Sequence, residues 1–159
     1  GGPRGDRLGV VAFADAAVTV APLGTAASEI DARLDALPTA TGTDVAAGLT
    51  LALAEATGPA HRPGHPSAIV VLTDGRPTRG APGAPHDAAR AAAAAGVAVY
   101  AVGVGDDVDA ALLAELAGAP DRWVVAPEAA ALDRIYAALA LRIPCPPEQL
   151  WRGRAEAAP

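Results

Sequence analysis

The sequence has little that could hold a protein together except an aliphatic core. Its 159 residues include one cysteine and no methionine, and only 3% are aromatic. A single cysteine excludes an internal disulfide framework and a multi-cysteine zinc site. No apolar run approaches the length of about 18 residues that a membrane span needs, and no signal peptide is visible. Because 52% of the residues are hydrophobic, we expect one domain with a core of Ala, Val, Leu and Ile.

Lysine is also absent, so all 12 basic residues are arginine, against 18 Asp and Glu and a net charge of −6. Nucleic acids and anionic membrane surfaces are bound through basic patches. An acidic chain without a long apolar run is therefore expected to have no nucleic-acid partner and no membrane span.

The most informative stretch is Ser67–Thr78, which reads SAIVVLTDGRPT. Ile69–Leu72 is a continuous apolar run rich in β-branched residues, and this pattern predicts a strand buried on both faces. The run stops at Thr73-Asp74-Gly75, so the Asp74 carboxylate follows the carboxyl end of the strand, where open α/β sheets bind ligands. A simple turn role is an equal alternative, because Asp favours turns.

The other segments predict alternating strands and helices. Leu8–Phe13 and Val18–Leu23 are expected to pair antiparallel, with Pro22 placing the second strand at an edge. From residue 67 onward strands and helices alternate, which favours a parallel sheet with helices on both faces. The further predicted strands are Val97–Val102 and Trp123–Val125, and the later helices span about His86–Ala95, a segment with Leu112, Leu113 and Leu116, and Pro127–Arg142.

Helix starts and stops are marked by side chains of the usual types. Ser28–Asp31 resembles a capping box, and Pro38 ends the short helix that follows it. Thr43 or Asp44 is the natural N-cap of a helix over residues 44–57. Asp107 or Asp109 caps the helix with the three leucines, and Gly96 terminates the helix before it.

Several candidate motifs are better explained without a special function. Gly103-Val104-Gly105 lacks the third glycine of a dinucleotide loop, because Val stands at position 108. His61 and His65 could share a metal, but a loop with no third ligand favours solvated histidines. Arg4-Gly5-Asp6 is interpreted as a turn that enters a strand. No Ser/His/Asp or Cys/His arrangement is readable, so we expect no enzyme.

Five stretches, in one order, resemble the von Willebrand factor type A (VWA) family over nearly the whole length. They are GDRLGVVAFADAA, TATGTDVAAGL, SAIVVLTDGRPT, VAVYAVGVGDDVDAALLAELA and ALDRIYAAL. The resemblance implies a doubly wound, Rossmann-like α/β fold, with a mostly parallel sheet and one antiparallel edge strand. It assigns residues 1–143 to the domain and leaves residues 144–159 as a Pro-containing tail or linker.

The resemblance also implies a metal-ion-dependent adhesion site at the end of the sheet. In the family one loop supplies Asp-x-Ser-x-Ser, a second a Thr and a third an Asp. Thr43 matches that Thr and Asp74 matches that Asp, with Asp44 and Gly75 flanking them as outer contributors. The cation would be Mg²⁺ or Mn²⁺, which prefer oxygen ligands, and an acidic residue of a partner protein would complete its coordination.

The sequence departs from the family at the first loop. Its serines are Ser28 and Ser67, and neither follows an aspartate by two positions, so Asp-x-Ser-x-Ser cannot be written. We expect an N-terminally truncated domain that lacks the family's first strand and helix, is less stable than the full domain, and binds Mg²⁺ weakly or not at all. Since that strand is central, the strands at Leu8–Phe13 and Ile69–Leu72 would expose unpaired edges or close on each other.

Three functions follow, and the leading one is a protein-binding module whose complete form holds a divalent cation. The alternatives are a metal-free scaffold of the same fold and, less favoured, a nucleotide-binding α/β enzyme. Cys145 is either a free thiol or paired with a cysteine outside the sequence. The family occurs inside cells, on surfaces and secreted, and an extracytoplasmic or membrane-tethered location is slightly favoured. The partner, the oligomeric state and the compartment are not decided by the sequence.

Overall fold

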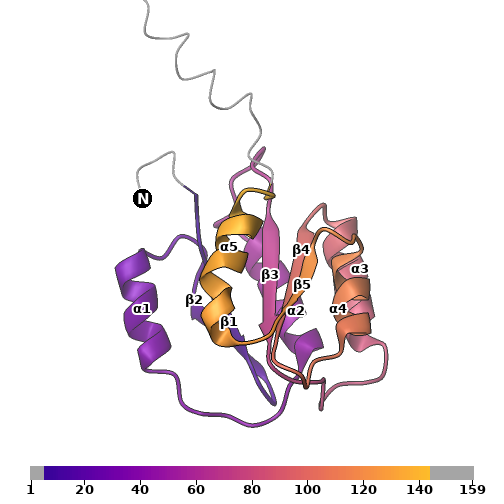
Figure 1. Ribbon diagram of the computed structural model, residues 1–159. Coiled ribbons are helices and arrows are strands. Elements are labelled where there is room, and N and C mark those ends of the chain that lie inside the picture. Colours follow the sequence, from indigo (N-terminus) through magenta and orange to yellow (C-terminus); the bar gives the residue numbers. More distant parts are fainter. Residues whose placement is uncertain (1–5, 144–159) are drawn as a thin grey trace, which may run out of the picture.

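The computed structural model describes residues 6–143 of the chain (Figure 1). Most of the Arg4-Gly5-Asp6 tripeptide, the predicted tail 144–159 and Cys145 lie outside the described residues. The elements in order are β1 (Val10–Phe13), β2 (Ala17–Ala21), α1 (Ala27–Asp35), α2 (Val45–Thr57), β3 (Ala68–Thr73), α3 (Ala84–Ala94), β4 (Ala98–Val104), α4 (Ala110–Ala117), β5 (Trp123–Ala126), the 3₁₀ helix η1 (Ala129–Ala131) and α5 (Leu132–Ala140). No described helix combines the length and apolar character that crossing a membrane requires.

The strands form the predicted pairs but are divided over two sheets. β1 and β2 pair antiparallel, and β3, β4 and β5 form a parallel sheet in that order. In residues 6–143 no ladder of hydrogen bonds joins β1 to β3. Two outcomes were expected for β1 and β3, unpaired edges or direct pairing with each other. The structure shows unpaired edges among the described residues. The α/β class with its antiparallel edge pair is confirmed.

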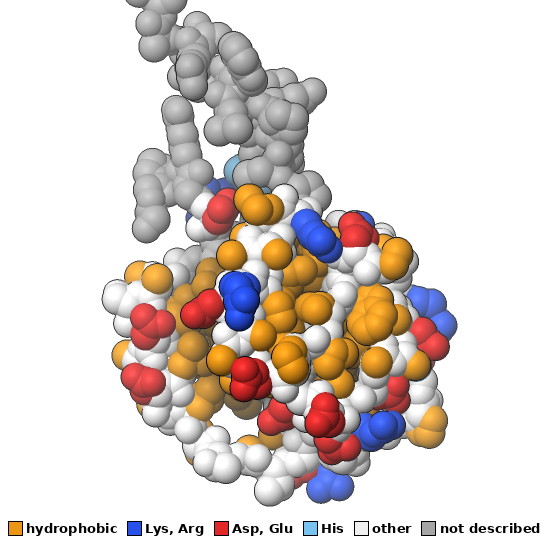
Figure 2. Space-filling model, viewed as in Figure 1, with side chains coloured by type: hydrophobic (Ala, Val, Ile, Leu, Met, Phe, Trp, Pro, Cys, Tyr) orange, Lys and Arg blue, Asp and Glu red, His pale blue; other side chains and the backbone are white. Residues whose placement is uncertain are grey.

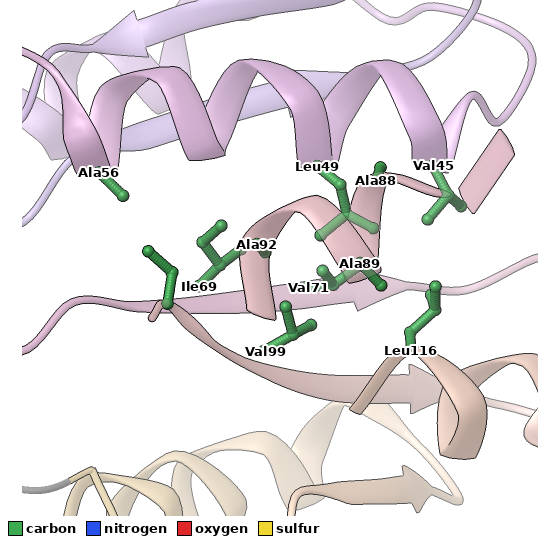
Figure 3. Packing of buried hydrophobic residues seen from close by; sticks show 11 residues of the cluster. Val45, Leu49, Ala56, Ile69, Val71, Ala88, Ala89, Ala92, Val99 and Leu116 are labelled. Carbon is green, nitrogen blue, oxygen red and sulfur yellow. The ribbon is translucent and has the colours of Figure 1, made fainter. Parts of the chain in front are cut away.

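The main core lies between the sheets and the helices behind them. α2 contacts β1, β2, β3 and α3, so it spans both sheets. Its Val45 and Leu49 are 2% and 1% exposed and pack with Ile69 and Val71 of β3 (Figure 3). α3 contributes alanines to the same cluster, whose small side chains let the helix approach the sheet closely. The aliphatic core expected from the composition is thus built around α2.

The front face of the parallel sheet is covered only in part. α5 lies in front of it, where Leu139 packs with Tyr100 and Val102 of β4 (Figure 1). The side chains of Val70 and Leu72 on β3 remain 36% and 38% exposed. Hydrophobic side chains gather over the middle of this face (Figure 2). The prediction that β3 is buried on both faces is therefore wrong for the described residues, since its side chains alternate between a covered and an open face.

The predicted element ends are right where an aspartate or glycine marks them. Asp44 and Asp109 cap α2 and α4, and Gly96, with φ of +73°, follows the end of α3. The capping box at Ser28–Asp31 is wrong, because α1 begins one residue earlier and its N-cap, Ala26, offers no side-chain oxygen. The single helix predicted over 127–142 is instead η1 followed by the shorter α5.

Substitutions on the two faces of β3 test this partial cover. We expect Val71→Ala, at a position 5% exposed, to lower the free energy of unfolding by about 2 kcal/mol, because it leaves a cavity in the core. The matched control Val70→Ala carries the same loss of β-propensity on the open face and should cost about 0.5 kcal/mol. Urea unfolding at 25 °C measures both, and equal losses would mean that the two faces are covered alike.

Candidate functional site

The carboxyl end of β3 and the N-terminus of α2 meet at one edge of the fold. β3 ends at Thr73, and Asp74 follows in an exposed turn. The Thr73 hydroxyl accepts a hydrogen bond from the Gly75 amide at 3.3 Å and donates one to the Gly75 carbonyl at 3.0 Å. Thr73 is the buried polar residue of the described core, at 8% exposed. The side chain that closes the strand thus also fixes the turn that carries Asp74.

Thr43 lies beside this turn. Its amide donates to the Thr78 hydroxyl at 2.9 Å, and its carbonyl accepts from the Thr78 amide at 3.1 Å. The Thr43 Oγ1 is 3.9 Å from the point where a Cβ on Gly75 would stand. The structure therefore brings together the loop before α2 and the loop after β3, and with them two residues 31 positions apart, Thr43 and Asp74.

Asp44 has the helix-capping role that the sequence left open between it and Thr43. Its Oδ1 accepts from the Ala47 amide at 2.9 Å, which satisfies one of the free N–H groups at the start of α2. The Asp44 amide donates to the Ala14 carbonyl at 2.7 Å, in the turn between β1 and β2. Because Asp44 serves as the cap, the Thr43 side chain is not needed for that purpose.

Three further residues lie beside the site, and no local pattern in the sequence indicates them. Asp15, in the β1–β2 turn, accepts a hydrogen bond from Arg79 Nε at 2.5 Å and another from the Thr41 hydroxyl at 3.2 Å. Arg79 comes from the loop after β3 and Thr41 from the loop before α2. We call Asp15, Thr41 and Arg79 the rim clamp. Arg79 is 64 residues from Asp15, so no local pattern could have paired them.

Arg79 lowers the pKa of Asp15. The main cause is the hydrogen bond from its guanidinium, assisted by the positive charge, and partial desolvation of the carboxyl acts in the opposite direction. The Arg79 and Asp15 side chains are 55% and 50% exposed, so solvent and salt screen the pair.

A second pairing links the Asp74 loop to the next loop of the sheet. Arg76 lies 3.7 Å from Asp107 and 3.9 Å from Asp109, both between β4 and α4. The arginines that follow Asp74 are thus each paired with aspartates of neighbouring loops. Because these arginines are paired, little positive charge is left here to attract an acidic group of a partner protein.

The other candidate motifs have structural explanations. A Cβ on Gly103 would stand 2.8 Å from Leu113 Cδ1 and 3.0 Å from Val108 Cγ2, so this glycine permits the close packing of α4 on β4. His61 Nδ1 lies 3.2 Å from the Ser67 hydroxyl. Within residues 6–143, no three His, Cys, Asp or Glu side chains are grouped so that they could hold a metal ion.

Comparison with known proteins assigns the fold to a family. The model of the von Willebrand factor type A domain matches residues 1–138. The chain belongs to the VWA family. Mouse matrilin-1 is 33% identical over an alignment of 127 residues that covers 75% of this chain and 24% of matrilin-1. The chain thus spans about a quarter of that curated relative.

Solved structures agree with this assignment. Proximal thread matrix protein 1 of the mussel byssus, with a zinc-occupied adhesion motif, gives a TM-score of 0.73 at 27% identity, over 87% of this chain and 36% of that chain. The manganese-loaded TRAP protein of Plasmodium vivax gives a TM-score of 0.67 at 15% identity, over 86% and 58% of the two chains. The second likeness shows the fold alone.

The residues at this edge fit a hard divalent cation in type but not in number. A threonine hydroxyl and an aspartate carboxylate are oxygen donors of the kind that Mg²⁺ and Mn²⁺ accept. Near-octahedral coordination needs six oxygens, of which Thr43 and Asp74 would supply two. The 159-residue sequence has no Asp-x-Ser-x-Ser to supply the rest.

The rim clamp predicts a pH dependence of stability. Because the pKa of Asp15 is lowered in the folded state, its stabilising contribution is complete above the unfolded value of about 4 and is lost as the pH falls through the lower folded value. We expect Asp15→Asn to reduce the free energy of unfolding by a constant amount between about pH 5 and 8, and by less below about pH 4. Urea unfolding across that range measures the difference. A difference that stays constant into acid would contradict the ion pair.

Proposed function

We propose that this VWA domain is a protein-binding module that uses Thr43 and Asp74 as two of the ligands of a divalent cation. The carrying observation is the contact between their loops, with Thr43 Oγ1 3.9 Å from the Cβ position of Gly75. Asp44 and Gly75 flank the ligands, Asp44 as the cap of α2 and Gly75 as part of the Thr73 turn. Thr43 and Asp74 account for two of the six positions of an octahedral cation, and other oxygen donors would fill the rest.

A similar metal-loaded structure supports a divalent cation. The byssus protein, 27% identical to this chain, is described with zinc in its adhesion motif. We propose Mg²⁺ or Mn²⁺ for this chain, because the two matching residues are hard oxygen donors. No covalent chemistry is needed, and we propose that the domain is not an enzyme.

An acidic residue of the partner protein is proposed to complete the coordination. Arg76 and Arg79 are already paired with aspartates of neighbouring loops, so they would attract a carboxylate only weakly. A bound cation supplies the positive charge that such a contact needs. Partner binding is then expected to depend on the metal. Similarity to a matrix protein of the byssus favours an extracytoplasmic location.

A metal-free scaffold is the second candidate, and the hydrogen bonds of the site favour it. Thr43 and Thr78 exchange two hydrogen bonds, and Asp44 caps α2. These contacts hold the loops together through protein groups alone. In this alternative Asp74 is a turn residue and the partner docks without a cation.

Paramagnetic Mn²⁺ distinguishes the two candidates even when binding is weak. We expect micromolar Mn²⁺ to broaden the amide resonances of Thr43 and Gly75 before those of α1. Thr43→Val removes a hydroxyl ligand and Asp74→Asn removes the negative charge of the carboxylate, each at nearly constant shape. Each should reduce the broadening about tenfold, because hard cations favour charged and hydroxyl oxygens. Heteronuclear NMR of the 159-residue chain measures it.

Matched controls lie on α2 and on α1. Thr50→Val removes a hydroxyl whose bond stays within α2, at the Ala46 carbonyl, and Asp35→Asn removes an exposed carboxylate. Neither should alter the broadening at Thr43 and Gly75. Equal broadening in Asp74→Asn and in the wild type would exclude Asp74 as a ligand and favour the scaffold.

The incomplete donor set predicts weak affinity for magnesium. Calorimetric titration of residues 1–159 should show no Mg²⁺ binding tighter than about 1 mM, because two protein oxygens compete poorly with the water bound to the ion. Tight binding would contradict this and would require ligands that the loops of Thr43 and Asp74 do not include.

A further inference from the structure

Three loops at the edge of the fold are tied together by one carboxylate. Asp15 lies in the β1–β2 turn, Thr41 in the loop before α2 and Arg79 in the loop after β3. Arg79 Nε donates to one Asp15 oxygen at 2.5 Å and the Thr41 hydroxyl donates to the other at 3.2 Å. Both oxygens of Asp15 are thus engaged, one by each of the loops that carry Asp74 and Thr43.

Gly42 shows how closely the loop before α2 follows this carboxylate. A Cβ at Gly42 would stand 2.2 Å from Asp15 Oδ1, and the residue has φ of +84°, which favours glycine. The space that a side chain would need is therefore filled by Asp15. Thr43 follows immediately, so the path of its backbone depends on where Asp15 lies.

Backbone hydrogen bonds continue the connection to Thr43. The Asp44 amide donates to Ala14, the neighbour of Asp15, at 2.7 Å. Thr78, the neighbour of Arg79, exchanges two hydrogen bonds with Thr43. Each residue of the ion pair is thus adjacent to a residue that bonds directly to Thr43 or Asp44. This is the arrangement of a support that fixes a site without belonging to it.

We propose that Asp15 and Arg79 are positioning residues that hold Thr43 against the Asp74 loop. Neither side chain is assigned to the cation. The ion pair joins the β1–β2 turn to the loop after β3, and the Thr41 hydrogen bond joins the loop before α2 to the same carboxylate. Asp15 thereby fixes the distance between these two loops, and the position of the Thr43 hydroxyl depends on that distance. The inference rests on the proposed function for its purpose, but the positioning itself is a property of the loops and can be measured without a metal.

Amide hydrogen exchange of the full 159-residue chain tests the positioning. In Asp15→Asn the side chain keeps its shape and loses its charge. We expect the amides of Thr43, Asp44 and Thr78 to exchange about tenfold faster, because a charge-assisted bond that restrains them is weakened. The Ala95 amide, which bonds within α3, should be unchanged. Unaltered exchange at the three amides of the site would overturn the proposal.

The Arg79 variants separate charge from bulk. Arg79→Gln should reproduce the faster exchange and Arg79→Lys should restore part of the protection. In the double variant Asp15→Asn with Arg79→Gln, the three amides should exchange no faster than in either single variant, since the two residues act as one unit. The matched control is Asp87→Asn, which breaks a similar exposed pair with Arg90 within α3. This control should not change the exchange rates of the three amides. If Asp87→Asn accelerated them as much as Asp15→Asn, the proposal would also be overturned.

Manganese broadening then links positioning to the site. We expect Asp15→Asn to require about tenfold more Mn²⁺ for equal broadening at Thr43, the loss that corresponds to one weakened restraint. Equal Mn²⁺ dependence in the variant and the wild type would overturn the role in the site. Should the wild type show no broadening at Thr43 or Gly75, the cation proposal fails, and hydrogen exchange alone decides whether Asp15 and Arg79 hold the loops.

Discussion

The packing of α2 across both sheets is the contact on which the rest of the fold depends. In residues 6–143 no ladder joins β1 to β3, so the helix that touches both must set their relative position. Glu55, near its C-terminus, accepts from the Thr19 hydroxyl at 3.1 Å and from the Leu23 amide at 3.2 Å. Asp44, at the other end, binds the β1–β2 turn through its amide. The helix is therefore attached to the β1–β2 hairpin at both ends and buried against β3 between them.

This arrangement also decides where the candidate site lies. The burial of Val45 and Leu49 against β3 brings the N-terminus of α2 to the carboxyl end of the strand. Thr43 and Asp74 then reach the same edge because they precede and follow elements that pack together. The apolar core supplies most of the free energy that fixes the two backbones, while polar contacts such as the rim clamp tie the loops to one another. The candidate residues therefore lie on loops that are held in place by the rigid elements α2 and β3.

Local sequence signals predicted those parts of the fold that depend on neighbouring residues. Asp44 and Asp109 are helix caps because a side-chain oxygen three residues before a free N–H is sufficient. The Asp74 turn was found because a buried strand ended there. The ion pair of Asp15 and Arg79 could not be predicted, since the β1–β2 turn and the loop after β3 meet only in three dimensions. The start of α1 was misplaced because Ser28 matches a capping box by type, although the helix already begins at Ala27.

The error at β3 has a physical cause of its own. A run of Ile, Val, Val and Leu is typical of a strand covered on both faces. Here the described residues cover Ile69 and Val71, while Val70 and Leu72 stay about one third exposed. This open face belongs to the same strand whose edge toward β1 has no ladder and whose end carries Asp74. The open face, the unpaired edge and the proposed cation ligand Asp74 therefore occur at one place in the fold, so a change in how β3 is covered would affect the site as well as the core.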